Sequence, residues 1–203
     1  EQAKSVESEG PIYQSIHFVD KPCGLPTHSA HKDPSPETWG VFERLKHQFS
    51  QQKNFFTVHR LDSATSGALI FATETHSATA LVELFSQQKI KKKYLFITDR
   101  SCQKEEFSLE SNIEKKGSRF VSEALPPMGT DRTHVTKSFA QTKFQKLACS
   151  QNLTLWQAEP QTGKTHQIRL HASQMNIPVL GDTEYGGSRS ARLMLHSLSL
   201  QFD

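Results

Sequence analysis

The chain has 203 residues, of which 35% are hydrophobic, with a formal net charge of +3 and a mean hydropathy of −0.57. Its longest uninterrupted apolar run has only five residues, Ala68 to Ala72, which argues against a transmembrane helix of about 20 residues. The composition therefore predicts a globular protein with a modest core and one large or two small domains.

The N-terminus and the cysteines bear on where the protein works. Residues 1–10 are polar and lack the apolar core of a secretory signal, so we expect a tail over these residues, followed by one domain over residues 11–203. Cys23, Cys102 and Cys149 are widely spaced and form no CxxC pair, which argues against a disulfide framework. We expect a protein of a reducing compartment, with a cytoplasmic location.

The first half of the chain predicts strands and two helices. Loose apolar alternation over 12–20 predicts a strand, and the prolines and glycine of 21–26 end it in a loop. Ser35-Pro36-Glu37 supplies an N-cap, a first-turn proline and an acid, so a helix is predicted over 36–49. The remaining elements of this half are strands over 55–59 and 67–72 and an amphipathic helix over 77–88.

The second half is richer in strands. Residues 101–137 are polar and predict short strands and long loops. A helix is predicted over 165–175, with Thr165 as its cap and an apolar face of Ile168, Ala172 and Met175. Further strands are predicted over 93–98, 139–147 and 153–158 and through Leu198, Leu200 and Phe202. Strands outnumber helices without regular βαβ alternation, so we predict an α+β fold with a mixed, mostly antiparallel central sheet.

The segment from His59 to Gly67 is the most informative stretch of the chain. Its single carboxylate, Asp62, follows a basic pair and precedes small hydroxyl residues, between two predicted strands. A side chain at such a turn can project into a cleft. Alternatively, Asp62 only accepts hydrogen bonds from the turn backbone at residues 64–66.

Two later residues suit the same cleft. Arg169 lies at the flank of its helix's buried face, about 100° from Ile168, where it could pair with Asp62 and keep that carboxylate ionised. A plain surface arginine is the alternative. Tyr94 opens an apolar strand and offers a stacking face and a hydroxyl, although a core tyrosine fits the pattern too.

Residues 89–100 carry five basic side chains against one acidic side chain. Such a stripe on a nearly neutral protein suits a polyanion bound along one face, and a solvated lysine face is the other interpretation.

The histidines do not favour a metal site. His28 with His31 and His166 with His171 lack an HExxH motif or a Cys/His quartet, and no glycine-rich phosphate loop is present. We expect neither a metal nor a nucleotide cofactor.

Taken together, these segments resemble the RluA-type RNA pseudouridine synthases, in family order from about residue 12 to residue 202. The matching segments are Lys21-Pro22-Cys23-Gly24-Leu25 with His28, residues 59–67, Lys93-Tyr94-Leu95, residues 162–171, residues 178–182 with Tyr185-Gly186, and Leu195-His196 with Leu198. The resemblance implies the pseudouridine synthase fold, with an active-site cleft. It also implies that a uridine base is detached from its ribose, rotated and rejoined through carbon 5, without a cofactor.

The resemblance also assigns residues. Asp62 falls on the essential aspartate, Arg169 on the arginine that pairs with it, and Tyr94 on the tyrosine that stacks on the base. Ile168 matches an apolar wall of the uracil pocket, and Arg60 matches an arginine that can enter the RNA helix where the base has left. Further substrate contacts are expected from His59, Lys91, Lys92, Lys93 and Lys164.

The expected partner is structured RNA, a stem-loop of rRNA or tRNA, bound by a monomer that has no membrane contact. Only about ten residues precede the first predicted strand, so a stand-alone catalytic domain is expected. Lys164 departs from the family, whose members usually carry arginine there. The alternative function is an RNA-binding or RNA-chaperone protein on the same fold, with catalysis lost or secondary, and a metal-dependent hydrolase is a minor third.

Overall fold

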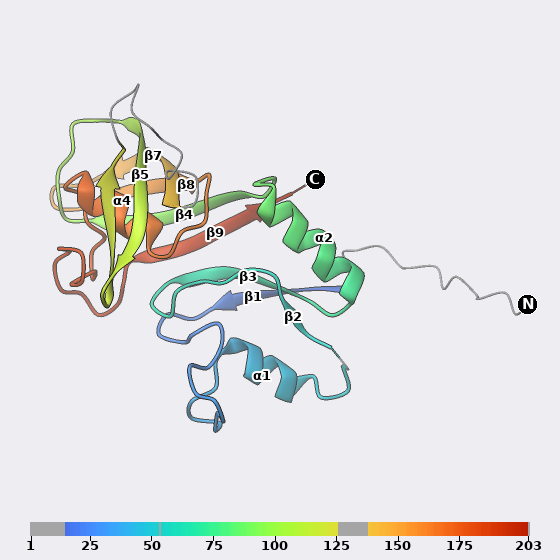
Figure 1. Ribbon diagram of the computed structural model, residues 1–203. Helices are drawn as coiled ribbons and strands as arrows, with labels where there is room; N and C mark the ends of the chain where they lie inside the picture. Colours follow the sequence, from blue (N-terminus) through green and yellow to red (C-terminus); the bar gives the residue numbers. More distant parts are fainter. Residues whose placement is uncertain (1–14, 53, 126–137, 203) are drawn as a thin grey trace, which may run out of the picture.

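A computed structural model describes residues 15–52, 54–125 and 138–202 of the chain. The expected tail over residues 1–10 lies outside these ranges. One nine-stranded sheet runs through the described part, in the order β1-β3-β9-β4-β8-β7-β5-β6, and β2 pairs with β3 (Figure 1). Its strands are β1 (Ile16–Lys21), β2 (Phe56–Thr57), β3 (Ser66–Ala72), β4 (Lys91–Thr98), β5 (Glu106–Lys116), β6 (Arg119–Ala124), β7 (Phe139–Cys149), β8 (Thr154–Pro160) and β9 (Leu195–Gln201).

Within the described ranges, three helices pack against this sheet: α1 (Val41–Gln48), α2 (Thr75–Ser86) and α4 (Gln167–Gln174). The paired strands are antiparallel except for β3 and β9, which pair in parallel. This mixed, mostly antiparallel α+β architecture is the one that the sequence predicted. Among the described residues, no helix is both long and apolar enough to cross a bilayer.

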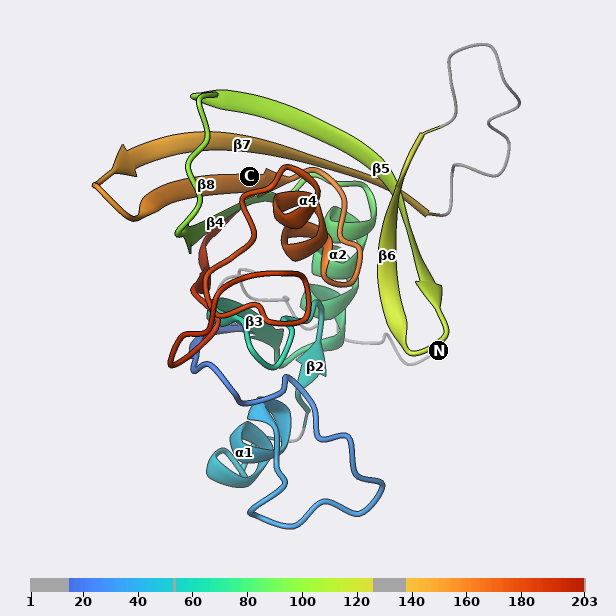
Figure 2. The same cartoon turned by 90° about the vertical axis from the view of Figure 1, so that its left-hand side faces the viewer.

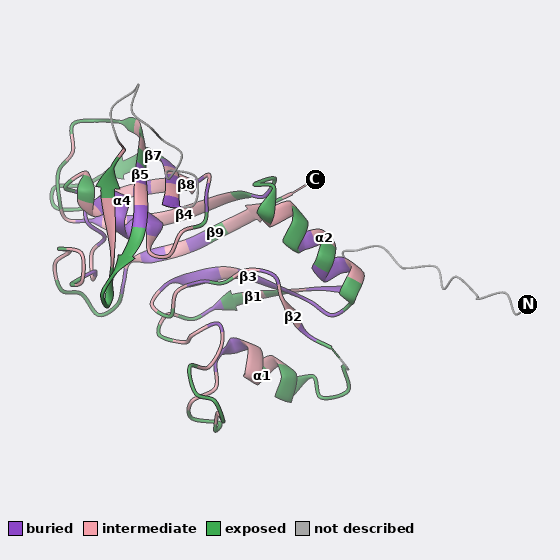
Figure 3. Cartoon of the chain, in the orientation of Figure 1, coloured by how far each residue is buried: buried purple, intermediate pink, exposed green. Residues whose placement is uncertain are grey.

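The two ends of the sheet carry separate apolar cores. At one end, the fully buried Trp156, Phe96 and Phe144 of neighbouring strands pack beneath Ile168 and Ala172 of α4. At the other end, β3 is covered on one face by α2 and on the other by the segment that contains α1. Figure 3 shows buried positions along β3 and α4, whereas much of α2 is exposed. Figure 2 shows α4 in the upper half of the view, below β7, and α1 at the bottom.

The parallel pairing of β3 with β9 joins these two ends. Gly67 adopts a positive φ of 110°, and a Cβ there would collide with the backbone of Ser197 in β9. Only glycine lets the two strands approach this closely. The turn that carries Asp62 is therefore anchored where β3 meets the centre of the sheet.

Helix α1 begins at Val41 and not at Pro36 as the sequence predicted. The Ser35-Pro36-Glu37 signal instead forms a separate turn, in which the Thr38 amide donates to the Ser35 carbonyl at 2.9 Å. Gly40, the N-cap, lies against the backbone of the preceding loop, and the Val41 amide donates to the Pro26 carbonyl at 2.9 Å. These tertiary contacts fix where the helix starts.

The polar segment after β4 also differs from the prediction of short strands and long loops. Its described part forms a long hairpin of β5 and β6, which turns through Gly117 at a φ of 61°. Pairing of β5 with β7 and burial of Ser111 and Ile113 stabilise strands whose composition is otherwise polar. Residues 126–137 of the predicted loop lie outside the described ranges.

Candidate active site

A cleft of about 560 Å³ opens between the two ends of the sheet. Its walls are the turn between β2 and β3, the end of α2, the start of β4, the β8–α4 loop and the start of α4. It brings together eight of the ten site residues expected from the sequence: His59, Arg60, Asp62, Lys92, Tyr94, Lys164, Ile168 and Arg169. Lys91 and Lys93 do not line it.

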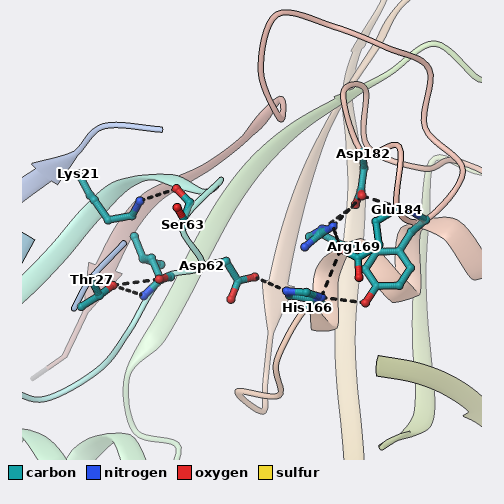
Figure 4. Close-up of polar contacts among 10 residues, drawn as sticks. Lys21, Thr27, Asp62, Ser63, His166, Arg169, Asp182 and Glu184 are labelled. Atoms are coloured by element: carbon teal, nitrogen blue, oxygen red, sulfur yellow. Dashed lines mark hydrogen bonds and ion pairs between the residues drawn. The ribbon is translucent and has the colours of Figure 1, made fainter. Parts of the chain in front are cut away.

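Main-chain contacts hold the Asp62 turn on both sides. Thr27 Oγ1 donates to the Leu61 carbonyl at 2.9 Å and accepts from the Leu61 amide at 3.1 Å. The fully buried Lys21 donates to the carbonyl of Ser63 at 2.9 Å, and also to those of Pro22 and Leu25. Burial lowers the pKa of Lys21, and the charges of Cys23 and Asp62 partly oppose that shift. Figure 4 shows these ties flanking Asp62, whose side chain points away from them into the cleft.

This geometry decides between the two interpretations of Asp62. The turn hydrogen bond runs from the Thr65 amide to the main-chain carbonyl of Asp62, at 3.0 Å, and not to its carboxylate. The carboxylate is 32% exposed, and its ion-pair contact in the described structure is with His166. Asp62 is thus a cleft-facing acid on a rigid turn.

His166 was not predicted to belong to the site, although it stands in a histidine pair and in the family-like segment over residues 162–171. Its Nε2 atom lies 3.9 Å from Asp62 Oδ2, and its Nδ1 atom lies 2.8 Å from the hydroxyl of Tyr185. It is the N-cap of α4 in the left-handed region, with φ of 57°, so Thr165 is not the cap that the sequence predicted. The Gln167 carboxamide oxygen instead accepts from the Lys164 amide at 2.9 Å and shapes the loop.

Arg169 does not pair with Asp62, and this corrects the expected ion pair. Its guanidinium makes two 2.7 Å hydrogen bonds to the carboxylate of Asp182 and one of 2.8 Å to Glu184 (Figure 4). The Tyr185 ring lies 4.7 Å from the guanidinium carbon. A forked contact with the almost fully buried Asp182 is stronger than a single contact with the more exposed Asp62. Burial alone would lower the pKa of Arg169, but the hydrogen bonds and charges of Asp182 and Glu184 outweigh it and raise the pKa.

Tyr94 and Ile168 form an apolar part of the cleft. Burial, with a smaller contribution from the charge of Asp62, raises the pKa of Tyr94 to about 12, although a hydrogen bond with Ser197 opposes the shift. The hydroxyl therefore stays protonated at neutral pH. Ile168 is 6% exposed and packs at the start of α4. Together they offer a ring face and an aliphatic surface beside Asp62.

The polar residues around the rim differ in their surroundings. The His59 Nε2 atom accepts the Ile70 amide hydrogen at 3.0 Å, and the ring stacks on Phe85. Burial, assisted by the charge of Lys92, lowers the pKa of His59 to about 4, so His59 is a neutral supporting residue at pH 7. Arg60 is exposed at the rim.

The basic run at the start of β4 is divided between the two faces of the strand. Lys92 faces the cleft, donates to the Thr162 carbonyl at 2.9 Å, and has its pKa lowered by burial to about 8. Lys93 Nζ lies 3.9 Å from a carboxylate oxygen of Glu159, and Lys91 is exposed. Because side chains alternate along a strand, the run is not one continuous stripe.

Metal ligands do not gather in the part of the chain that the structure describes: no three His, Cys, Asp or Glu side chains there are placed to hold an ion together.

Comparison of the fold defines the class of protein. The structure resembles that of human RNA pseudouridylate synthase domain containing 4, with a TM-score of 0.74 and 22% identity over 93% of this chain and 81% of the other. It also resembles human RNA pseudouridylate synthase domain containing 1, with a TM-score of 0.71 and 21% identity over 96% and 80% of the two chains. These likenesses establish the pseudouridine synthase fold.

Sequence comparison gives the family. Residues 15–174 match the model of the RNA pseudouridylate synthase family, and the chain belongs to it. It is 34% identical to an uncharacterised RNA pseudouridine synthase of Haemophilus influenzae, over 95% of this chain and 81% of that protein. It is 33% identical to the ribosomal large subunit pseudouridine synthase C of Rickettsia bellii, over 96% of this chain and 64% of that protein. The tRNA pseudouridine synthase C of Vibrio parahaemolyticus is 29% identical over 94% and 83%. Members of the family are isomerases that convert uridine to pseudouridine in RNA.

Proposed function

We propose that this protein isomerises a uridine of rRNA or tRNA to pseudouridine in the cleft between β4 and α4, with Asp62 as the essential carboxylate. The observation that carries the proposal is the Asp62 turn, which Thr27 and Lys21 hold through its backbone while the carboxylate faces the cleft. The substrate class follows from the family and from the names of two relatives, one ribosomal and one tRNA-specific.

The reaction makes and breaks bonds within one nucleotide. The bond from ribose C1′ to uracil N1 breaks, the base turns, a bond from C1′ to C5 forms, and the C5 proton leaves as N1 gains one. Asp62 can attack C1′ as a nucleophile, or remove the C2′ proton to give a glycal intermediate. Both routes need a carboxylate beside the sugar, and the 32% exposed side chain of Asp62 faces the cleft where the sugar would lie.

The other cleft residues suit a base that has left its stack. An enzyme that acts on a base in a folded nucleic acid must extrude it, at a cost of a few kcal/mol. The Tyr94 ring and Ile168 provide surfaces on which uracil can lie, because stacking on an aromatic ring contributes about 1–3 kcal/mol per base. The exposure of Arg60 at the rim supports a role in filling the gap left in the RNA.

Arg169 acts on the site indirectly in this proposal. Its ion pairs with Asp182 and Glu184 hold the segment that follows α4, and that segment carries Tyr185 against His166. Arg169 is therefore a positioning residue in the arrangement described.

The decisive experiment compares Asp62→Asn and Asp62→Ala with the parent. The assay measures tritium released from bulk rRNA and tRNA labelled at uridine C5, prepared from cells lacking the protein. Loss of a group that acts in proton transfer costs about 100- to 10,000-fold in rate, so both variants should be close to inactive. Asp20→Asn is the matched control, since Asp20 is exposed on β1 and outside the cleft. Retention of full activity by pure Asp62 variants would refute the assignment.

The same assay distinguishes the proposed isomerase from the alternative function. RNA binding by the parent without any tritium release would favour an RNA-binding or RNA-chaperone protein on this fold. We further propose that the protein works as a cytoplasmic monomer with its catalytic domain over residues 11–203. A larger species in sedimentation at working concentration would contradict the monomer.

A further inference from the structure

The loop between β8 and α4 lines the cleft, and a buried carboxamide holds its backbone. The loop carries Lys164, and the first turn of the helix that follows carries Ile168, both of which line the cleft. Gln167, the first residue of α4, is only 4% exposed. Its carboxamide oxygen accepts from the Lys164 amide at 2.9 Å and from the Thr162 hydroxyl at 2.7 Å. The shape of the loop therefore depends on where this carboxamide is held.

Main-chain groups fix the orientation of the Gln167 carboxamide. The Lys164 amide can only donate a hydrogen bond, so the carboxamide oxygen must face it. The Gln141 carbonyl of β7 can only accept one, so the carboxamide nitrogen must face that carbonyl, at 2.9 Å. The same nitrogen lies 2.9 Å from the hydroxyl oxygen of Thr142, which must therefore accept from it.

This orientation determines where the next hydrogens lie. A threonine hydroxyl has one hydrogen, and because Thr142 accepts from Gln167, its own hydrogen is donated to His171 Nδ1 at 2.8 Å. The hydrogen of the neutral ring must then lie on Nε2, which donates to the hydroxyl of Ser111 on β5 at 2.8 Å. His171 is neutral at pH 7, because burial lowers its pKa to about 4. A hydrogen-bond chain with one direction thus runs through Gln167, Thr142, His171 and Ser111.

Water cannot replace the members of this hydrogen-bond chain. Thr142, His171 and Ser111 have no solvent exposure. A buried donor or acceptor that loses its partner costs about 1–3 kcal/mol, so each bond favours the one arrangement in which all are made. The loop and α4 are therefore held to β5 and β7 in a single register.

We propose that Gln167 is a positioning residue for the reaction, whose carboxamide is fixed by the hydrogen-bond chain through Thr142 and His171 and in turn fixes the loop that lines the cleft. It acts through its neighbours Lys164 and Ile168. The inference rests on the proposed function and deepens it, because it says how the RNA contact and the wall of the uracil pocket are kept in place. A displacement of about 1 Å in such a site can cost about 100-fold in rate.

Two substitutions of Thr142 separate hydrogen bonding from packing. Thr142→Val removes the hydroxyl and leaves no cavity, whereas Thr142→Ser keeps the hydroxyl and removes a methyl group. We expect kcat/KM for tritium release to be about tenfold or more lower in Thr142→Val than in Thr142→Ser, which should stay within about threefold of the parent. A threonine that only fills the core predicts the reverse order, because the lost methyl group leaves a cavity. Both variants are assayed at a temperature at which urea melts show them to be folded.

Thr98→Val is the matched control. Thr98 is also a fully buried threonine of a strand, and its hydroxyl oxygen accepts from the Arg100 amide at 3.2 Å, but it lies outside the cleft. Its kcat/KM should equal that of the parent. Gln167→Met removes the carboxamide itself and should lose at least as much activity as Thr142→Val. If Gln167→Met does not fold, the two Thr142 variants decide.

The position of the ring hydrogen of His171 gives a readout that does not depend on activity. In protein labelled with nitrogen-15 in histidine, the NMR signals that disappear in His171→Gln belong to this ring, and they should show the hydrogen on Nε2 at pH 7. A hydrogen on Nδ1 would refute the hydrogen-bond chain. An active parent with Thr142→Val as active as Thr142→Ser would overturn the positioning role and leave the proposed function intact. A parent that releases no tritium would overturn the proposed function, and the role of Gln167 with it.

Discussion

Lys21 shows how one buried side chain can set the position of another. Its ammonium has no solvent exposure and is shared by the carbonyls of Pro22, Leu25 and Ser63, so it joins the end of β1 to the turn next to Asp62. A buried cation is tolerated because these acceptors replace its water. The consequence is that the backbone of the turn is fixed beside Asp62, whose side chain faces the cleft.

Replacing Lys21 should therefore affect both stability and catalysis. Lys21→Met leaves three carbonyls without their donor, and we expect a loss of roughly 3 kcal/mol in the free energy of unfolding, measured in urea. The folded variant should also lose pseudouridine formation, because the Asp62 turn is no longer held. Lys32→Met removes an exposed lysine and should change stability by less than about 0.5 kcal/mol. Equal effects of the two substitutions would contradict this role for Lys21.

For the residues of the cleft, the sequence predicted membership of the cleft better than it predicted the contact partners of each side chain. Asp62 and Tyr94 could be placed because each stands at the boundary of a strand-like pattern, where a side chain can reach a cleft. The partner of Arg169 could not be predicted from the sequence, because Asp182 and Asp62 are both carboxylates and only packing decides between them. His166 was missed because its left-handed backbone conformation leaves no signature in the residue pattern.

Among the elements, α4 departs furthest from the simple amphipathic helix that its sequence suggests. Six of its residues are buried, including Gln167, Arg169 and His171, so polar side chains face the interior as well as Ile168. His171 is fully buried, with its two ring nitrogens 2.8 Å from Ser111 of β5 and Thr142 of β7. Helix α4, whose N-cap is His166, is thus held against the sheet by hydrogen bonds as well as apolar contacts.

Because His171 is buried, the protein should lose stability in acid. Burial lowers the pKa of His171 to about 4 from an ordinary value of 6.5, so the unfolded chain binds more protons between these pH values. The stability that the neutral His171 contributes is therefore lost as pH falls from about 6.5 to about 4. The free energy of unfolding decreases over this range by about 3 kcal/mol at most. His171→Gln removes this titration, and its unfolding free energy should fall less steeply over that range in urea melts. Some slope should remain from His59, whose pKa is also lowered to about 4. Parallel curves for parent and variant would refute this account.

Some element boundaries are set by the local sequence pattern, and others by tertiary contacts. Strands β3 and β8 and helix α2 appear close to their predicted ranges, because their apolar alternation or helical spacing reflects the burial of one face or both. The start of α1 and the β5–β6 hairpin depend on contacts with distant backbone, at Pro26 and in β7, which a local pattern does not contain.

For the molecule as a whole, the cleft lies where the two halves of the sheet meet. Each half has its own apolar core, and the close contact of Gly67 with β9 joins them behind the cleft. Site residues therefore come from segments about a hundred positions apart, Asp62 on one half and His166 on the other. An RNA that reaches Asp62 must pass the basic side chains that line this opening.

The salt dependence of RNA binding should reveal which basic residues lie along that path. Arg60 and Lys164 line the cleft, whereas Lys91 and Lys93 of the basic run at the start of β4 do not. All four residues were expected to contact RNA. Each phosphate contact adds about 0.7–0.9 to the slope of log affinity against log salt, so a double substitution of Arg60 and Lys164 to glutamine should reduce the slope by about 1.5. The same change at Lys91 and Lys93 removes an equal charge and should reduce it far less, because Lys93 faces Glu159. The measurement is a binding titration of bulk tRNA and rRNA from 50 to about 200 mM salt. If the second pair lowered the slope as much as the first, the RNA would run along the outer face of β4 and not into the cleft.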